Sequence, residues 1–147
     1  MSTLEYYKLI RNSIQFRNVE LVSLNCIKRK KESISNQGNE VQIMLKREVN
    51  VLSEDEAEIL LHSIVGIPDG LFEFEVEYKG ICFKTEALSK PQFEQYAYDQ
   101  IVPLLLPYAR ECIASTMARM GLPAFNIPTM DVLDSLDANS HAFEDQE

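Results

Sequence analysis

The sequence predicts an α+β domain in which a four-stranded antiparallel sheet is followed by C-terminal helices that pack on one face of the sheet. Three observations support this prediction. The first half of the chain holds four segments rich in β-branched and aromatic residues, and one of them alternates between apolar and polar residues. The second half places apolar residues at helical spacing. The two kinds of segment are separated along the chain rather than interleaved, which favours α+β over a parallel α/β fold.

The first two strands are predicted on either side of a polar stretch. Residues 14–27 are rich in Ile, Val, Phe and Leu, and their apolar phase shifts between Phe16 and Val19, so we expect a kink or bulge there. The polar residues 28–40 predict a long crossover loop. Residues 41–51 alternate with a period of two, which is typical of an antiparallel strand with one face in solvent.

The third and fourth strands are predicted over residues 57–67 and 71–83, joined by a tight hairpin. The turn Ile67-Pro68-Asp69-Gly70 has proline at its second position and glycine at its end, where positive φ is tolerated. Gly80 predicts a second bulge. The fourth strand divides into an apolar face, with Phe72, Phe74, Val76 and Tyr78, and an acidic face, with Glu73, Glu75 and Glu77.

The helical half begins at Ser89, which starts a capping box with proline in the first turn. Pro103 and Pro107 are predicted to break this helix and to start another, which ends at Gly121. A short last helix is expected over residues 130–136.

The chain is expected to form one domain over residues 1–136, followed by an acidic, disordered tail over residues 137–147. No targeting segment is expected, because residues 1–14 mix charges with apolar residues. The longest apolar run, residues 101–109, is interrupted by proline and too short to span a bilayer.

The composition is that of an acidic protein, with a formal net charge of −9. Nucleic acids and anionic membranes bind positively charged proteins, so neither is an expected partner of this acidic chain. The basic run Lys28–Lys31 is interpreted as a solvated loop. The three cysteines, Cys26, Cys82 and Cys112, are widely spaced and odd in number, which favours free thiols in a reducing compartment. We therefore expect a cytoplasmic location.

Sequence motifs for catalysis are absent, so the protein is not expected to be an enzyme or to carry a cofactor or metal. The five glycines form no phosphate loop, which argues against ATP-driven work. His62 and His141 have no ligand partner at a suitable spacing. The row Glu73, Glu75 and Glu77 is open to three interpretations: a solvated face, a docking surface, or an acid/base cluster.

Residues 107–123 read Pro-Tyr-Ala-Arg-Glu-Cys-Ile-Ala-Ser-Thr-Met-Ala-Arg-Met-Gly-Leu-Pro. This stretch resembles the signature of the SecB family of export chaperones, in which a PYARE helix start leads to a Gly/Pro loop. Residues 126–128 and 130–133 are similar to the segment that follows in the family, where a proline precedes a short Asp-containing helix. The close match extends over residues 107–136.

The resemblance implies an ATP-independent chaperone that binds unfolded preproteins, keeps them competent for export and passes them to the SecA motor. It also implies a homotetramer built as a dimer of dimers, with the helices between the dimers. Ala109, Ala114 and Ala118 are the small residues that would permit close helix approach. Packing within one subunit explains the same residues equally well.

The resemblance further implies a groove for unfolded peptides between the sheet edge and the loop after the long helix. The residues expected there are Phe74, Val76, Leu122, Phe125, Ile127, Met130 and Leu133. For each of them, a place in the core or in an oligomer interface is the alternative. Glu73 and Glu75 fall where the family's sheet face meets the motor.

The sequence departs from the family pattern at several points. Ser13 and Arg17 stand in the first strand where acidic residues are expected, the crossover loop has no aromatic residue, and the tail is only loosely similar to the motor-binding tail. Two alternatives therefore stay open. One is a SecB-like chaperone dedicated to a single client of a toxin–antitoxin system, and the other is a small-molecule-binding α+β domain with a closed pocket.

Overall fold

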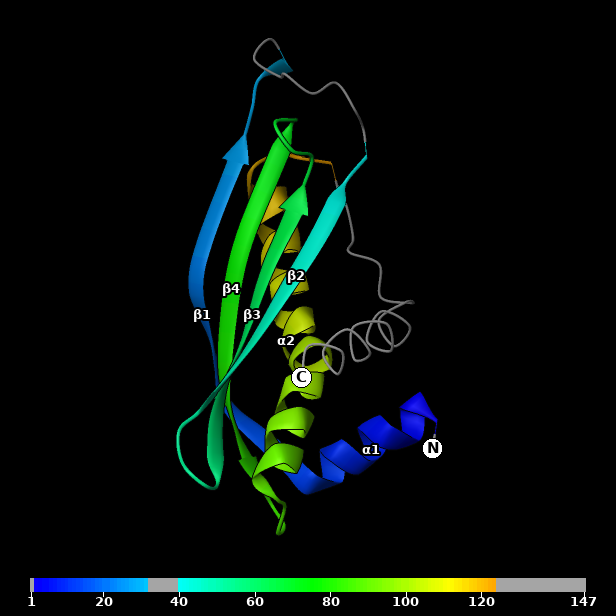
Figure 1. The fold of residues 1–147 in the computed structure, drawn as a ribbon. Coiled ribbons are helices and arrows are strands. Elements are labelled where there is room, and N and C mark those ends of the chain that lie inside the picture. The colour runs from blue at the N-terminus through cyan, green and yellow to red at the C-terminus, as the bar shows by residue number, and fades with distance from the viewer. Residues whose placement is uncertain (1, 32–39, 124–147) are drawn as a thin grey trace.

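The computed structural model describes residues 2–31 and 40–123 and confirms the α+β class (Figure 1). The described elements are α1 (Thr3–Ser13), β1 (Ile14–Lys28), β2 (Gln42–Val51), β3 (Glu56–Gly66), β4 (Phe72–Lys84) and α2 (Lys90–Arg119). The four strands form one antiparallel sheet in the order β1-β4-β3-β2. Helix α2 runs along one face of this sheet, and the core lies between them (Figure 1).

The hairpin between β3 and β4 has the predicted turn. The N–H of Gly70 donates to the carbonyl of Ile67 at 2.7 Å, and Asp69 takes a positive φ of 55°. Gly66 precedes the turn at φ 154°, and a Cβ there would lie 2.5 Å from the carbonyl oxygen of Phe72. The close approach of the two strands therefore requires glycine at position 66.

The predicted kink in the first strand is a β-bulge. The pairing of β1 with β4 shifts between Arg17 and Glu20, where Asn18 has a φ of 56°. A second shift follows between Leu21 and Ser23. The bulge predicted at Gly80 is misplaced, because Gly80 pairs regularly with Ile59 and the extra residue lies opposite it on β1. A glycine at that position leaves room for the bulged strand, whose Val19 side chain is 3.6 Å from where a Cβ would be.

Helix α2 is one continuous helix of 30 residues, so the predicted break at Pro103 and Pro107 is wrong. Each interior proline removes a helical hydrogen bond and costs about 3 kcal/mol. The buried face that α2 packs on the sheet offsets this cost: Phe93, Ala97, Ile101, Leu105, Ile113 and Met117 are each almost fully buried. The predicted capping box at Ser89 is confirmed. So is the stop at Gly121, which has a φ of 69°.

Helix α1 is not among the predicted elements. Ser2 and Glu5 form a capping box at its start, which is the sequence signal that could have identified it. Its Ile10 is fully buried against the core, and its last residue leads directly into β1. Helix α1 extends away from the sheet at the end opposite the β3–β4 hairpin (Figure 1).

The remaining sequence predictions concern residues that lie outside the described part of the chain. These are the interior of the crossover loop, the last helix over residues 130–136, and the tail over residues 137–147. No helix among the described residues is long and apolar enough to cross a membrane.

Candidate binding surface

The residues predicted for a peptide groove divide into two groups. Phe74 and Val76 lie on the α2 side of β4 and are 1% and 0% exposed, and Leu122 is also buried. A bound segment would reach Phe74 and Val76 only if α2 moved off the sheet. The other predicted groove residues, Phe125, Ile127, Met130 and Leu133, lie outside the described residues.

The apolar side chains that are exposed gather on the two edge strands, which the sequence analysis did not identify. Because the strand order is β1-β4-β3-β2, the outer backbone edges of β1 and β2 have no strand partner within the described residues. Such an edge is a template for pairing with another chain. The exposed large apolar residues of these strands are Leu21, Val22, Leu24, Ile27, Ile43, Met44 and Val51.

An apolar surface joins the β1 edge to α2. Leu24 and Leu21 pair with Val76 and Tyr78 of β4, so their side chains lie on the sheet face that α2 covers only in part. The ring of Tyr108 on α2 is 5.9 Å from that of Tyr78 and is 43% exposed. We call Leu21, Leu24, Tyr78 and Tyr108 the β1–α2 surface.

The β2 edge differs from the β1 edge because Arg47, in the middle of the strand, contacts α2. The guanidinium of Arg47 lies 4.1 Å from the centroid of the Tyr98 ring on α2, which ties the strand to the helix. Beyond it, Ile43 and Met44 are 39% and 53% exposed. Ile43 pairs with Val65, Val65 pairs with Phe74, and Phe74 pairs with Cys26. This row of paired residues crosses the sheet at the end where α2 ends. We call Ile43 and Met44 the β2 end.

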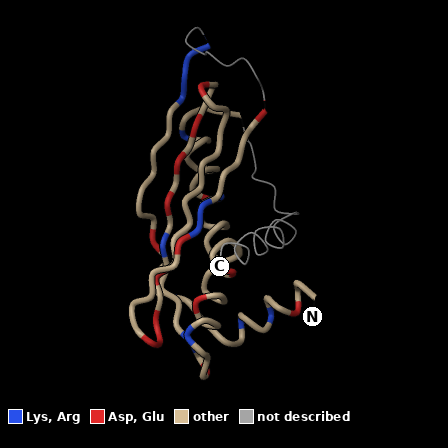
Figure 2. Tube along the Cα trace, in the orientation of Figure 1, with Lys and Arg blue, Asp and Glu red and all other residues tan. Residues whose placement is uncertain are grey.

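Two carboxylates of the acidic face of β4 contact other side chains of the same chain, and one of these side chains is a cation. Figure 2 shows acidic positions repeating along β4. Arg29 pairs with Glu73 at 2.5 Å, and His62 contacts Glu75 at 2.7 Å. Glu77 makes no ion pair among the described residues. The two residues expected to dock a motor therefore already have partners within the subunit.

The small residues predicted for helix association do not share one environment. Ala109 is fully buried between α2 and the sheet. Ala114 and Ala118 are exposed, one helical turn apart, on the side of α2 that faces away from the sheet. Only these two are accessible to a second copy in the described structure.

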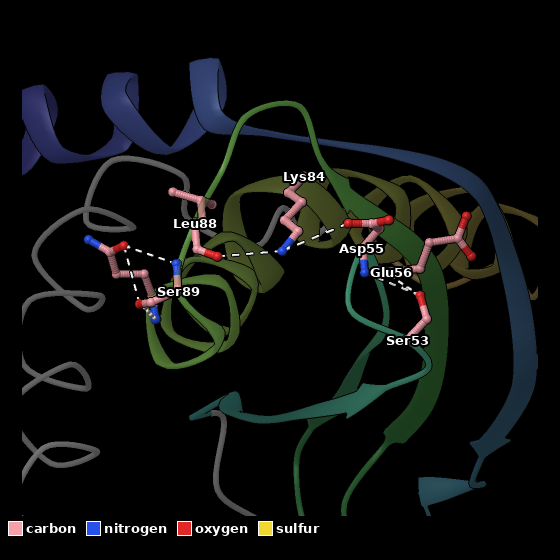
Figure 3. A network of polar contacts seen from close by, with 7 residues as sticks. Ser53, Asp55, Glu56, Lys84, Leu88 and Ser89 are labelled. Atoms are coloured by element: carbon pink, nitrogen blue, oxygen red, sulfur yellow. Dashed lines mark hydrogen bonds and ion pairs between the residues drawn. The ribbon is translucent and has the colours of Figure 1, made fainter.

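A hollow of about 560 Å³ lies between the β2–β3 turn and the start of α2, and its lining includes Leu52, Lys84 and Phe93. The Lys84 ammonium group there is engaged by other groups of the protein (Figure 3): Lys84 Nζ is 3.4 Å from the carbonyl of Leu88 and 3.8 Å from the Asp55 carboxylate. These contacts occupy a cation that a ligand site would direct at its ligand.

Within the described residues, no group of His, Cys, Asp and Glu is arranged to hold a metal ion. His62 is half-buried and bonded to Glu75. The three cysteines are free thiols, with Cys82 and Cys112 buried and Cys26 half-buried. Burial raises the pKa of the Cys82 thiol to about 12, which leaves it protonated and unreactive at neutral pH.

The described residues form an α+β domain in which one long helix covers the sheet and neither edge strand has an outer strand partner within these residues. The chain belongs to the SecB family: it matches the family model described as preprotein translocase subunit SecB over residues 10–138. No curated protein matches the chain.

Two solved structures share the fold. The Mycobacterium tuberculosis SecB-like chaperone Rv1957, in complex with a ChAD peptide from the HigA1 antitoxin, superposes with a TM-score of 0.67 at 13% identity, over 86% of this chain and 96% of that one. A Streptococcus agalactiae protein of unknown function has a TM-score of 0.50 at 10% identity, over 79% of this chain and 97% of that one.

Proposed function

We propose that the protein is an ATP-independent chaperone that binds unfolded preproteins through the β2 end and keeps them competent for export. Membership of the SecB family supports a chaperone function. The observation that supports the location is the pair Ile43 and Met44, exposed on a strand whose outer edge has no partner among the described residues.

The chemistry of this edge suits an unfolded chain. An extended segment adds to a free strand edge through main-chain hydrogen bonds, which every sequence can supply. Apolar side chains of the segment are buried at about 25 cal/mol per Å². Methionine adapts its shape to varied side chains, which favours broad rather than selective binding. Capture of the unfolded state then opposes folding by mass action, so no nucleotide is needed.

We place the predicted groove residues Leu122, Phe125 and Ile127 on the other wall of this site. Leu122 follows α2 directly, at the same end of the sheet as Ile43, and its N–H donates to the carbonyl of Met117. The apolar segment that continues from Leu122 therefore starts at the same end of the sheet as Ile43, beside Lys28 of β1, whose Nζ donates to the carbonyl of Met120 at 2.8 Å. A bound polypeptide would lie between this segment and the β2 end.

The β1–α2 surface is proposed as the contact between copies in a homotetramer. It combines exposed Leu21, Leu24 and Tyr108 with a long strand edge that has no strand partner among the described residues, and Ala114 and Ala118 lie further along the same helix. Obligate interfaces between copies are more apolar than transient ones. Sedimentation of wild type and of Leu24→Glu tests this, with the substitution expected to shift the protein towards smaller species.

The function is tested by diluting a denatured, slowly folding preprotein into buffer with and without the protein, in the absence of nucleotide. A refolding delay that saturates with chaperone concentration supports the proposal. No delay, together with no binding by a panel of unfolded chains, contradicts it.

A dedicated client is the second candidate, and the internal pairing of the acidic face favours it. With Glu73 paired to Arg29, the face presents less free negative charge to a basic motor, and Glu75 is engaged by a contact with His62. The same panel of unfolded chains separates the two candidates. Capture of many chains supports the export chaperone, and capture of one antitoxin-like segment alone supports the dedicated chaperone.

A further inference from the structure

An apolar groove separates α1 from the middle of α2. It is a hollow of about 220 Å³ and is lined by Leu4, Tyr7, Lys8, Arg11, Gln100, Pro103 and Leu104. Leu4 is 53% exposed, although it faces a surface built from other apolar groups. Pro103 and Leu104 supply the wall on the α2 side. We call this the α1–α2 groove.

The cations on the rim of the groove have no counter-charge among the residues that the structure describes. Lys8 and Arg11 are exposed, one turn apart on α1, and neither makes an ion pair within the described part of the chain. The nearby carboxylates are engaged elsewhere: Glu5 accepts from the N–H of Ser2 at 2.9 Å, and Asp99 accepts from Tyr6 at 2.7 Å. An apolar floor with a positive rim suits an acidic, amphipathic polypeptide segment.

One segment of this chain outside the described residues has that composition. Residues 134–147 contain five Asp and Glu residues, no lysine and no arginine, together with the apolar side chains of Leu136 and Phe143. The negative charges of this segment would therefore attract the positive rim of the groove. The side chains of Leu136 and Phe143 are large enough to bury apolar area on the groove floor.

The connection is long enough to bring the segment to the groove. Pro103 and Arg119 are 16 residues apart on α2, a distance of about 24 Å along the helix axis. Residues 123–134 span up to about 36 Å when extended. The segment can therefore return along α2 to its own groove without strain.

We propose that residues 134–147 dock in the α1–α2 groove of the same chain, with their carboxylates against Lys8 and Arg11. Docking there ties α1 to α2 and leads residues 124–133 back along α2 from the β2 end. The site lies apart from the β2 end, so its occupation is a property separate from client capture.

The chain contains no tryptophan, which allows a direct test in the full-length protein. Leu136→Trp and Phe143→Trp each introduce a single fluorophore into the segment. We expect at least one of the two emission spectra to be shifted to the blue relative to the same variant in denaturant. Adding K8E and R11E should move that emission to the red, and so should high salt, because the charge attraction is screened. K31E with K46E is the matched control, since both lysines are exposed and lie outside the groove.

Three results overturn the proposal. Emission that is insensitive to K8E/R11E, or equally sensitive to K31E/K46E, shows that the groove does not hold the segment. A blue shift that disappears on dilution shows that a second copy supplies it. An unshifted emission combined with weaker client capture by K8E/R11E assigns the groove to clients. Circular dichroism of every variant confirms that the fold is intact before the spectra are compared.

Discussion

Tyr6 Oη donates a hydrogen bond to Asp99 Oδ2 at 2.7 Å, and this bond joins α1 to the buried side of α2. Asp99 is 1% exposed and also accepts from Gln95 at 2.9 Å. The ring of Tyr6 packs edge-on against Tyr96 at 5.8 Å. The Tyr6–Asp99 pair therefore anchors α1, which is the one described element outside the two layers formed by the sheet and α2.

Removal of the Tyr6 hydroxyl should therefore destabilise the protein. Tyr6→Phe keeps the ring but removes one of the two described donors to Asp99 Oδ2, so a buried carboxylate loses a hydrogen bond at a cost of about 1–3 kcal/mol. Urea unfolding followed by circular dichroism measures this loss. Tyr96→Phe is the control, because the Tyr96 hydroxyl makes no hydrogen bond among the described residues and its loss should change little. Equal stability of the two variants would argue against the bond.

Alkaline pH should weaken the fold in a defined window. Burial raises the pKa of Tyr78 to about 12 with help from a hydrogen bond with Cys112, and burial raises the pKa of Cys82 to about 12. Burial also raises the pKa of Tyr6, and the bond to Asp99 adds to this. In the unfolded chain these groups have their ordinary pKa values, 9.0 for cysteine and 10.0 for tyrosine.

Because the folded-state values are raised, the unfolded chain binds fewer protons than the native state above pH 9.0. The stabilising contribution is complete below that pH and is lost as the pH rises towards about 12. Urea midpoints measured from pH 8 upward test this, with Cys82→Ala expected to flatten the early part of the decline. A midpoint that stays constant or rises through the window would be inconsistent with these buried groups.

Two glycines on the same strand pair should respond very differently to alanine. Gly66→Ala places a Cβ 2.5 Å from a backbone oxygen at a φ of 154°, so we expect a loss of at least about 2 kcal/mol. At Gly80 the nearest atom is 3.6 Å away, and Gly80→Ala should stay within about 1 kcal/mol of wild type. Thermal unfolding compares them, and similar losses in both would contradict the described approach of β3 to β4.

Charge placed at the β2 end should impair client capture without unfolding the protein. Ile43→Glu with Met44→Glu places one carboxylate on each face of the exposed strand end, and we expect the concentration needed for half-maximal refolding delay to rise at least about tenfold. Leu9→Glu on α1 is the matched control, since Leu9 is 38% exposed and lies on a different element. If both variants delay refolding as wild type does, the β2 end is not the binding site.

The sheet could be predicted from the sequence because its signals are local. Alternation along residues 42–51 and the Pro-Asp-Gly turn each fix an element without reference to the rest of the chain. The unbroken helix could not be predicted in this way. Pro103 and Pro107 disfavour a helix locally, and only the packing of α2 on the sheet outweighs them.

The binding surface depends on strand order, which no local pattern reveals. Phe74 and Val76 share an apolar face with Phe72 in the sequence, but the alternation does not say that α2 covers that face. Likewise, the exposure of Ile43 and Met44 follows from the position of β2 at the sheet edge. The acidic row was correctly assigned to the opposite face, whereas its pairing with Arg29 and His62 required the folded structure.

The chaperone function is tested most directly by fluorescence anisotropy without nucleotide, comparing the binding of a reduced, alkylated and permanently unfolded polypeptide with that of its native form. We expect saturable binding of the unfolded form alone, and weaker binding by the variant that carries Ile43→Glu and Met44→Glu. Equal binding of the native and unfolded forms, or no binding of either across a panel of sequences, would contradict a chaperone that recognises unfolded chains at the edge of its sheet.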